Sequence, residues 1–513
     1  MAIKRKSIIT GALMLTAAGL VTRVLGFVYR IYMSNTIGAE GMGLYQLIMP
    51  AYSLAWSIAC SGFTTTISKI VAQENAAQEY GNMGRALKQA LAITGIIAGV
   101  LTCAFFFGAD AIGLMIFHDT RTVMPIRILS AAIPFMTAGS CIRGYFLGLR
   151  ETTEPALGQV LEQCVRMGVI YAIAPLFVPR GLEYACAAAV VGIVAGECIA
   201  FFFSSFSYVS FKRKHHLVKP PTKSSAHMLT LLVSMALPLT ANRITGSFLS
   251  MWENTLIPQK LREFGMTQTE AISAYGRITG MALPLIFFPS ALLTALAVTL
   301  VPAISEAIAA DNHARIRATA AKSILFTNII GFCATALFLV LPDELGQVIY
   351  RQDLGSLLFF LGILCPFWYV NIPLGGILNG LGKQRFIFRN SLLSSAVNIG
   401  FVYFFVPRYG IAAFLAGWFL SLLGVTLVSL REIKKETGLQ LDRARCLAKP
   451  LLAALAAGLT TELVTNRVIA ALFSGYFALF ASAGVLVGLY VLLVILLGCV
   501  SWTELRGMVR GKR

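Results

Sequence analysis

IPFMTAGSCIRGYFLGL (133–149) and CPFWYVNIPLGGILNGL (365–381) are two apolar stretches of the same chain that share a pattern of proline and glycine. The matching positions all lie 232 residues apart: Pro134 and Pro366, Gly144 and Gly376, and Gly148 and Gly380. The match resumes at FVPRGLEYA (177–185) and FVPRYGIAA (405–413). A repeat with this offset predicts that the chain is built from two similar halves.

The composition indicates the environment of these halves. Hydrophobic residues make up 57% of the 513 positions and charged residues only 13%. Soluble chains carry about 25% charged residues, so a polytopic membrane protein is expected. A helix needs about 20 apolar residues to cross the hydrocarbon core, and the chain contains fourteen such stretches. Their approximate ranges are 8–33, 45–67, 89–108, 124–147, 157–178, 184–209, 228–252, 276–302, 320–341, 355–379, 388–406, 410–430, 450–466 and 474–500.

The repeat and the spans together predict an all-α fold with fourteen transmembrane helices. Continuous apolar runs of this length exclude a membrane β-barrel, whose strands alternate in polarity. The repeat offset contains six spans, an even number, so the two halves have the same orientation and form a parallel repeat. We therefore expect two six-helix bundles related by a pseudo-twofold axis, plus two C-terminal helices. The expected divisions are 1–210 for the first bundle, 211–227 for a cytoplasmic linker, 228–432 for the second bundle, and 433–513 for the last two helices and tail.

Lysine and arginine are distributed unevenly between the loops. With the N-terminus inside, the cytoplasmic segments hold 28 of the 42 residues and the external loops hold 7. Because basic residues remain on the cytoplasmic side, we expect a cell-membrane protein with both termini cytoplasmic. This bias explains the net charge of +19 without nucleic acid as a partner, since no loop is as large as a folded domain. The basic clusters would instead contact anionic lipid head groups.

The cysteines and histidines give no pattern typical of a metal or redox site. No two of the ten cysteines have CxxC spacing, and the five histidines lie in loops or at span edges. The chain also lacks a Walker-type nucleotide-binding loop. We therefore expect no metal site, no cofactor and no hydrolysis of ATP by this chain.

Arginines inside the apolar spans are the main candidates for function. TRVLGFVYR (22–30) places Arg23 and Arg30 about 20° apart around a helix and about 10.5 Å apart along it. An arginine at bilayer depth costs at least about 2.5 kcal/mol, so these side chains are expected to face an interior cavity. Arg243 is central in its span, Arg277 opens the eighth span, and Arg143 lies in the lower part of the fourth.

Several guanidinium groups in one cavity favour an anionic substrate that carries phosphate groups. Arginine donates two hydrogen bonds in a fork that matches phosphate oxygens. Two structural alternatives stay open. Arg30 is close enough to the predicted outer boundary to reach the interface. Arg166 follows Glu162 by four residues, the order that favours a helical ion pair.

TRVLGFVYR, NTIGAEGMGLYQL (35–47) and FPSALLTALAVTLVPAISEA (288–307) resemble the polysaccharide-lipid flippase branch of the MATE-like multidrug/oligosaccharidyl-lipid/polysaccharide exporter superfamily. The resemblance extends over essentially the whole chain, and the 288–307 motif is most similar to the stage V sporulation protein B group. It implies a V-shaped transporter that works by alternating access on an undecaprenyl-pyrophosphate-linked saccharide, with lipid II as the leading example. It also implies that the last two spans line a groove for the lipid tail.

The resemblance assigns roles to individual arginines. Lipid II flippases show a similar S/T-R-x-L-G-F-x-R pattern, and Arg23 falls on its first arginine. Tyr29 stands where the pattern has its second arginine, and Arg30 follows one place later. Arg277 precedes Phe288 by eleven residues, a longer gap than in that family. The resemblance thus implies that these three arginines contribute to a pyrophosphate site, together with Arg143 and Arg243 from the analysis of the spans.

Three functional classes are open at this stage, and the flippase is preferred. A proton- or sodium-coupled multidrug antiporter would need a buried carboxylate, and the first span contains no Asp or Glu. A membrane-embedded glycosyl polymerase would need a large external loop with catalytic carboxylates, but the longest external loops, 253–275 and 342–354, are short. Glu162, Glu197 and Glu253 lie in or beside spans and are candidates for proton or sodium coupling. A monomer is expected.

Overall fold

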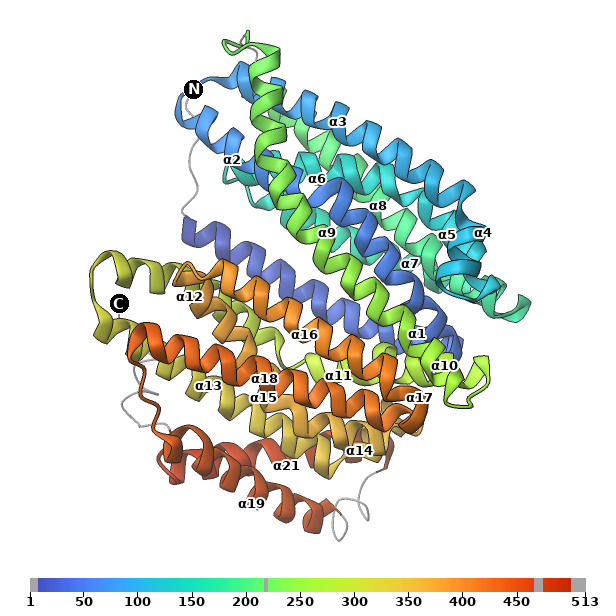
Figure 1. The fold of residues 1–513 in the computed structure, drawn as a ribbon, viewed down its shortest axis with the longest axis vertical. Helices are drawn as coiled ribbons and strands as arrows, with labels where there is room; N and C mark the ends of the chain where they lie inside the picture. Colours follow the sequence, from blue (N-terminus) through green and yellow to red (C-terminus); the bar gives the residue numbers. More distant parts are fainter. Residues whose placement is uncertain (1–7, 216–219, 466–473, 500–513) are drawn as a thin grey trace. The chain divides into compact units, whose positions relative to one another are not determined.

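The computed structural model of the chain describes residues 8–215, 220–465 and 474–499 (Figure 1). Within these ranges every regular element is a helix, which confirms the predicted all-α class. The chain forms two compact units, unit 1 from Met1 to Gly276 and unit 2 from Arg277 to Arg513. The divisions predicted at the linker and at residue 432 concern the repeat and stay predictions.

Unit 1 contains the following helices: α1 Ile8–Trp56, η1 Ser57–Ser61, α2 Gly62–Ala76, α3 Tyr80–Phe107, α4 Ala109–Ala111, η2 Ile112–Ile116, η3 Thr120–Thr122, α5 Val123–Ser130, α6 Ala132–Gly148, α7 Thr153–Phe177, η4 Val178–Arg180, α8 Leu182–Lys214, α9 Ser225–Glu263 and α10 Gln268–Gly276. Both α9 and α10 pack inside this unit. These two helices therefore belong with the first half in their contacts, although they follow the predicted linker in the sequence.

Unit 2 contains the remaining helices: η5 Arg277–Ala282, α11 Leu283–Phe287, α12 Ala291–Ala309, α13 His313–Val340, α14 Pro342–Leu345, η6 Gly346–Tyr350, α15 Gly355–Gly380, α16 Gln384–Phe404, α17 Val406–Tyr409, α18 Ile411–Thr437, η7 Ala444–Ala448, α19 Lys449–Val464 and α21 Gly475–Leu496. The two C-terminal helices, α19 and α21, pack against each other and against α13 (Figure 1).

Eleven helices of the described ranges are long and apolar enough to cross a membrane, or twelve when the bent pair Thr120–Ser130 and Ala132–Gly148 counts as one span. The multi-span class is confirmed, but the predicted number of fourteen is not reproduced. One reason is the run Met14–Ala76, whose 63 residues count once. At about 1.5 Å per residue it is about three times as long as the hydrocarbon core. Gly38 interrupts it with φ 70° and ψ −174°, so this run contains the first two predicted spans.

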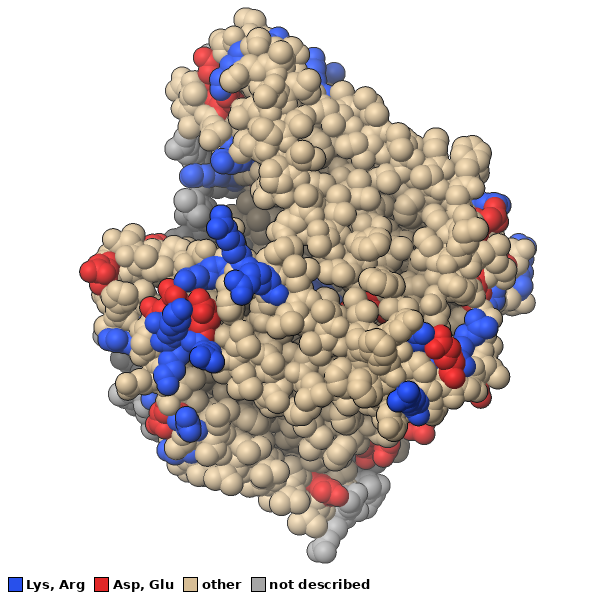
Figure 2. Space-filling model, in the orientation of Figure 1, with Lys and Arg blue, Asp and Glu red and all other residues tan. Residues whose placement is uncertain are grey.

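The charged residues are distributed as expected for membrane-spanning helices. On the face drawn in Figure 2, the charged side chains lie mainly toward the helix ends of each unit. Uncharged residues cover the surface between them. Lipid disfavours charge at depth, so this pattern agrees with the multi-pass class.

The sequence repeat is present in the packing of each unit. In unit 1, α6 crosses α2 at Gly144, where an added Cβ would lie 2.7 Å from the Thr64 carbonyl oxygen. In unit 2, α15 crosses α12 at Gly376, where an added Cβ would lie 2.7 Å from the Ala297 carbonyl oxygen. Such distances are too short for any side chain, so both crossings require glycine.

The turns that precede these helices also repeat. In unit 1, α4 continues into the π-helical turn η2, and His118 then has a φ of 55°. In unit 2, α14 continues into the π-helical turn η6, and Arg351 then has a φ of 54°. The repeat that was visible as glycines and prolines therefore extends to backbone turns whose sequences differ.

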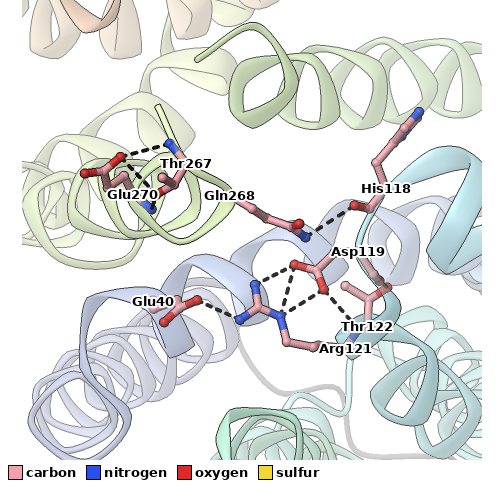
Figure 3. Close-up of polar contacts among 8 residues, drawn as sticks. All are labelled: Glu40, His118, Asp119, Arg121, Thr122, Thr267, Gln268 and Glu270. Atoms are coloured by element: carbon pink, nitrogen blue, oxygen red, sulfur yellow. Dashed lines mark hydrogen bonds and ion pairs between the residues drawn. The ribbon is translucent and has the colours of Figure 1, made fainter. Parts of the chain in front are cut away.

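A polar cluster joins separate segments at one end of unit 1 (Figure 3). Arg121 donates a hydrogen bond from Nη2 to Asp119 Oδ2 at 2.7 Å and from Nη1 to Glu40 Oε1 at 2.6 Å. Gln268 of α10 donates to the carbonyl oxygen of His118 at 3.4 Å. Burial alone would raise the pKa of Asp119, but hydrogen bonds from Arg121 outweigh it and the pKa is lowered. The cluster connects the kinked part of α1 to the turn after η2 and to α10.

The predicted linker 211–227 begins with the last turn of α8 and ends with the first residues of α9, and its residues 216–219 lie outside the described ranges. Its second part is fixed to α3. The buried Asn82 side chain accepts hydrogen bonds at Oδ1 from the backbone N–H groups of Thr222 and Lys223, at 3.0 and 3.1 Å. This part of the linker is therefore an ordered element of unit 1.

Candidate functional site

A cavity of about 740 Å³ lies inside unit 1, between α1, η1, α2, α6, α7, α8 and α9. We call it the unit 1 cavity. Its charged lining residues come from three helices and are Arg143 on α6, Glu162 and Arg166 on α7, and Glu197 on α8. Its neutral hydrogen-bonding lining residues are Tyr52, Ser53, Ser57, Thr64, Gln159 and Ser247. Charged and neutral polar side chains from several apolar helices therefore converge on one cavity.

Two glycines explain why the carboxylates of different helices share this cavity. The segment GIVAG places Gly192 and Gly196 one helical turn apart on α8. An added Cβ at Gly192 would lie 3.1 Å from the Arg166 carbonyl oxygen, and one at Gly196 would lie 2.9 Å from the Glu162 carbonyl oxygen. Small residues at this spacing let membrane helices approach closely. Glu197 follows directly and therefore lines the same cavity as Glu162.

The ion pair predicted on α7 is confirmed. Arg166 Nη2 donates to Glu162 Oε1 at 2.7 Å, and each side chain is 19% exposed. The negative charge of Glu162 and the positive charge of Arg166 compensate each other, because the two groups are in contact. In this geometry Glu162 and Arg166 neutralise each other.

Glu197 is held differently. The Tyr52 hydroxyl of α1 donates to Glu197 Oε1 at 2.7 Å, and the glutamate is only 5% exposed. Its second oxygen, Oε2, has no hydrogen-bond partner among the described residues. A buried carboxyl oxygen without a hydrogen-bond partner is costly. Oε2 of Glu197 is therefore the carboxyl oxygen of this cavity that could bind a cation or a proton.

Arg143 is the second charged group of the cavity that could bind a ligand. It is half-buried in the lining, and it forms no ion pair within the described part of the chain. Glu162 balances the charge of Arg166, although the Arg166 Nε–H makes no hydrogen bond within the described ranges. Arg143 is therefore the lining residue whose positive charge is available to an anionic ligand. The unit 1 cavity thus combines one available guanidinium group with one available carboxyl oxygen.

Arg243 lies beside the cavity. Its guanidinium carbon is 5.7 Å from the ring centroid of Trp56, which is itself a lining residue. One turn later on α9, the hydroxyls of Ser247 and Ser57 are hydrogen-bonded at 2.6 Å. This contact attaches α9 to η1 at the cavity wall.

Four further predicted site residues do not line the unit 1 cavity. Arg23 is exposed and Arg30 is half-buried on α1, Glu253 is half-buried on α9, and Arg277 is exposed at the start of unit 2. Their roles in substrate binding or ion coupling stay predictions.

Some residues of the cavity were missed by reasoning from the sequence. Tyr52 and Trp56 are aromatic residues in an apolar span and gave no signal of their own. The Gly192 and Gly196 pair was a usable signal, because the spacing of small residues marks a close helix crossing. It would have placed Glu197 against the helix that carries Glu162.

Unit 2 contains a groove of about 1170 Å³ between α13, α15, α18 and α19. We call it the unit 2 groove. Most of its lining is aliphatic or aromatic, and its basic lining residues, Arg431, Lys434 and Arg443, lie at the end where α18 leads toward η7. Of the two C-terminal helices expected to line a groove, α19 does so and α21 contributes no lining residue.

Two curated relatives from Bacillus subtilis (strain 168) are similar to this chain in sequence. Stage V sporulation protein B is 30% identical over 439 residues, which cover 84% of this chain and 84% of that protein. The lipid II flippase MurJ is 26% identical over 421 residues, which cover 74% of each chain.

Solved structures with the same fold include two kinds of transporter. An inward closed lipid II flippase MurJ matches with a TM-score of 0.71 at 12% identity, covering 94% of this chain and 98% of that one. An inward-facing multidrug resistance MATE family transporter of the MOP superfamily matches with a TM-score of 0.64 at 13% identity, covering 83% and 98%. The fold expected from the sequence is therefore confirmed. Residues 8–308 match the family described as polysaccharide biosynthesis protein, and the chain belongs to this family.

Proposed function

We propose that this chain is a flippase for an undecaprenyl-pyrophosphate-linked saccharide, such as lipid II or a related cell-wall or polysaccharide precursor. It moves this lipid from the inner to the outer leaflet by alternating access, with both termini in the cytoplasm. The observation that carries the proposal is the unit 1 cavity, where Arg143 is available to an anionic group. The sequence relatives add support, because one of them is named as a lipid II flippase.

The chemistry of the unit 1 cavity suits the pyrophosphate and saccharide part of such a lipid. A guanidinium group donates paired hydrogen bonds to phosphate oxygens. The hydroxyl and amide groups of Tyr52, Ser57 and Gln159 are the kind of donors and acceptors that bind sugar hydroxyls. Arg23, Arg30, Arg243 and Arg277 are proposed as further pyrophosphate ligands during the cycle.

The unit 2 groove suits the other part of the same molecule. Its largely aliphatic and aromatic lining favours a hydrocarbon chain, because such a lining makes close van der Waals contact with the chain and buries few polar groups without hydrogen bonds. A substrate with a charged saccharide end and a long lipid tail needs both kinds of surface, whereas a small hydrophilic substrate needs only the first.

We further propose that Glu197 couples transport to a proton or sodium gradient. Its free Oε2 atom supports this assignment. Glu162, the second candidate, is engaged by Arg166, and Glu253 does not line the cavity, so both are weaker candidates. No partner protein is proposed, and the transporter is expected to act as a monomer.

A multidrug antiporter is the second candidate function. The observation in its favour is the same Glu197 carboxyl, because a carboxylate in a cavity attracts organic cations. The fold does not decide between the two functions, since both kinds of transporter share it. The available cation Arg143 favours the flippase, because it would repel a cationic drug.

The test is depletion of the protein followed by mass spectrometry of the lipid-linked intermediates on each leaflet. We expect one undecaprenyl-linked saccharide to accumulate on the cytoplasmic leaflet, and its identity names the substrate. Arg143→Gln should fail to restore export, while Arg150→Gln, an exposed arginine in the connection between α6 and α7, should restore it. Loss of drug resistance without any such accumulation would favour the antiporter.

A further inference from the structure

The unit 2 groove has a polarity along its length. Its lining residues on α19 and the preceding turn run from Cys446 to Glu462, which corresponds to about 24 Å of helix. Arg431, Lys434 and Arg443 line the end near Cys446. On the face drawn in Figure 2, Lys and Arg gather together with acidic residues over the end of unit 2 where α18 ends.

The acidic residues around this end are already engaged. Lys383 lies 2.7 Å from Glu436 and 3.6 Å from Glu432. Asp442 accepts hydrogen bonds from the backbone N–H groups of Ala444 and Arg445, at 3.0 and 3.1 Å. These contacts use the carboxylates that are nearest in sequence to the basic lining residues.

The basic lining residues themselves are available. All three are exposed, and none of them makes an ion pair with another residue of the described ranges. Three cations at the mouth of an apolar groove, without an ion-pair partner in the described part of the chain, are complementary to a phosphate group with a hydrocarbon chain attached.

The length of the groove distinguishes between lipids. One leaflet accounts for about half of the ~30 Å hydrocarbon core, so a groove of about 24 Å extends beyond the depth that the chains of a leaflet lipid fill. A polyisoprenoid chain is long enough to occupy all of it. The occupant that fits both the charge and the length is therefore a polyisoprenoid phosphate.

We propose that Arg431, Lys434 and Arg443 form a phosphate-binding subsite that receives the phosphate end of a polyisoprenoid lipid whose chain lies in the unit 2 groove. This inference rests on the proposed function and goes beyond it. The subsite binds the phosphate rather than the saccharide, so it also accepts the sugar-free carrier, a polyisoprenoid monophosphate.

The test measures binding of undecaprenyl phosphate to the full chain by native mass spectrometry. The triple variant Arg431→Gln/Lys434→Gln/Arg443→Gln should bind at least about tenfold more weakly than the wild type, because charged hydrogen bonds are lost. The matched control is Lys435→Gln/Arg385→Gln/Arg389→Gln. It removes the same charge from exposed residues of unit 2 that do not line the groove, and it should bind like the wild type.

Further arms identify what is recognised. Undecaprenol, which lacks the phosphate, should bind weakly and equally to the wild type and the triple variant. Phosphatidylglycerol at the same concentration should not displace undecaprenyl phosphate. Leu455→Trp, in the groove lining, should weaken binding of both isoprenoids, whereas Leu452→Trp, exposed on the same helix but outside the lining, should not.

Two results would overturn the subsite. One is wild-type affinity in the triple variant, and the other is displacement by phosphatidylglycerol, which would indicate a general phospholipid site. If the triple variant binds normally while the wild type still exports its lipid-linked saccharide, only the subsite is wrong. If the wild type exports no such lipid and binds no undecaprenyl phosphate, the proposed function is wrong as well.

Discussion

The helix pairs α7–α8 of unit 1 and α16–α18 of unit 2 hold corresponding places in the repeat, but they use different chemistry. Between α7 and α8 the polar residues are charged, with Glu162 and Arg166 on one helix and Glu197 on the other. Between α16 and α18 charged groups meet at one end, where Lys383, the residue before α16, contacts Glu432 and Glu436 of α18. Further along the pair the polar contacts are neutral. The Ser394 and Ser421 hydroxyls are hydrogen-bonded at 2.7 Å, and Asn390 Nδ2 donates to Ser429 Oγ at 3.1 Å.

This difference separates what the fold requires from what a ligand requires. In unit 2, neutral hydrogen bonds join the two helices in the part of the pair that corresponds to the charged contacts of unit 1. Buried charges are expensive, and neutral replacements of similar size are often as stable. This cost supports the proposal that the charges of unit 1 serve ligand binding and ion coupling rather than helix packing.

The first prediction breaks the comparison by transferring the chemistry of unit 2 to unit 1. Arg166→Ala leaves Glu162 buried without its partner and should lower the free energy of unfolding by about 2–3 kcal/mol. The double variant Glu162→Ser/Arg166→Asn should regain most of this stability, because neither charge of the pair is left without its partner. Its transport should stay at least about tenfold below the wild-type rate. Thermal unfolding in detergent and export in a depleted strain are the two measurements.

A double variant that is stable and transports at the wild-type rate would contradict this interpretation. The ion pair would then be one of several equivalent ways to pack α7, and the difference between the units would carry no functional meaning.

The second prediction concerns Glu197. Glu197→Gln keeps an oxygen for the Tyr52 hydroxyl but removes the charge, so stability should change by less than about 1 kcal/mol. The dependence of transport on a proton or sodium gradient should be lost, measured in proteoliposomes with imposed gradients. Thr426→Val, on the corresponding helix α18 of unit 2, removes the hydrogen bond from Asn371 and should leave that dependence intact. An intact gradient response in Glu197→Gln would exclude this residue as the coupling site.

The sequence predicted the repeat and the class of fold because both depend on local patterns. Apolar runs define spans. Glycine is required where two helix backbones meet, as at Gly144 and Gly376. The ion pair of Arg166 was also predictable, since its partner lies on the same helix. The unit 1 cavity could not be predicted from the sequence, because it depends on which faces of several helices converge. Arg23 and Arg243 have equally plausible positions in the sequence, yet only Arg243 lies beside the cavity.

The third prediction tests the part that both units share. Gly144→Ala and Gly376→Ala each place a Cβ 2.7 Å from a backbone oxygen of the crossing helix. Each substitution should lower the free energy of unfolding by about 1–3 kcal/mol, with similar values in the two units. Gly168→Ala and Gly400→Ala are matched controls, because an added Cβ meets nothing within 4 Å at either position. A large cost in one unit alone would show that the repeated crossings are not energetically equivalent.

The fourth and smallest effect comes from the turns that follow η2 and η6. In unit 1 this turn carries the buried Asp119, whose pKa is lowered from its ordinary value near 3.8 by hydrogen bonds from Arg121 that outweigh burial. The folded protein therefore binds this proton less readily than the unfolded chain does, and the carboxylate stabilises the fold above that ordinary value. The contribution is about 1 kcal/mol, at the low end for a charged hydrogen bond because Arg121 is partly exposed, and it is lost as the pH falls through the lowered pKa. Asp119→Asn should thus melt below the wild type between pH 8 and 5, and the gap should close in stronger acid. Asp353→Asn, at an exposed position in the corresponding turn of unit 2, should show no such closing gap. A difference in melting temperature between Asp119→Asn and the wild type that is the same at every pH would mean that packing rather than charge stabilises this turn.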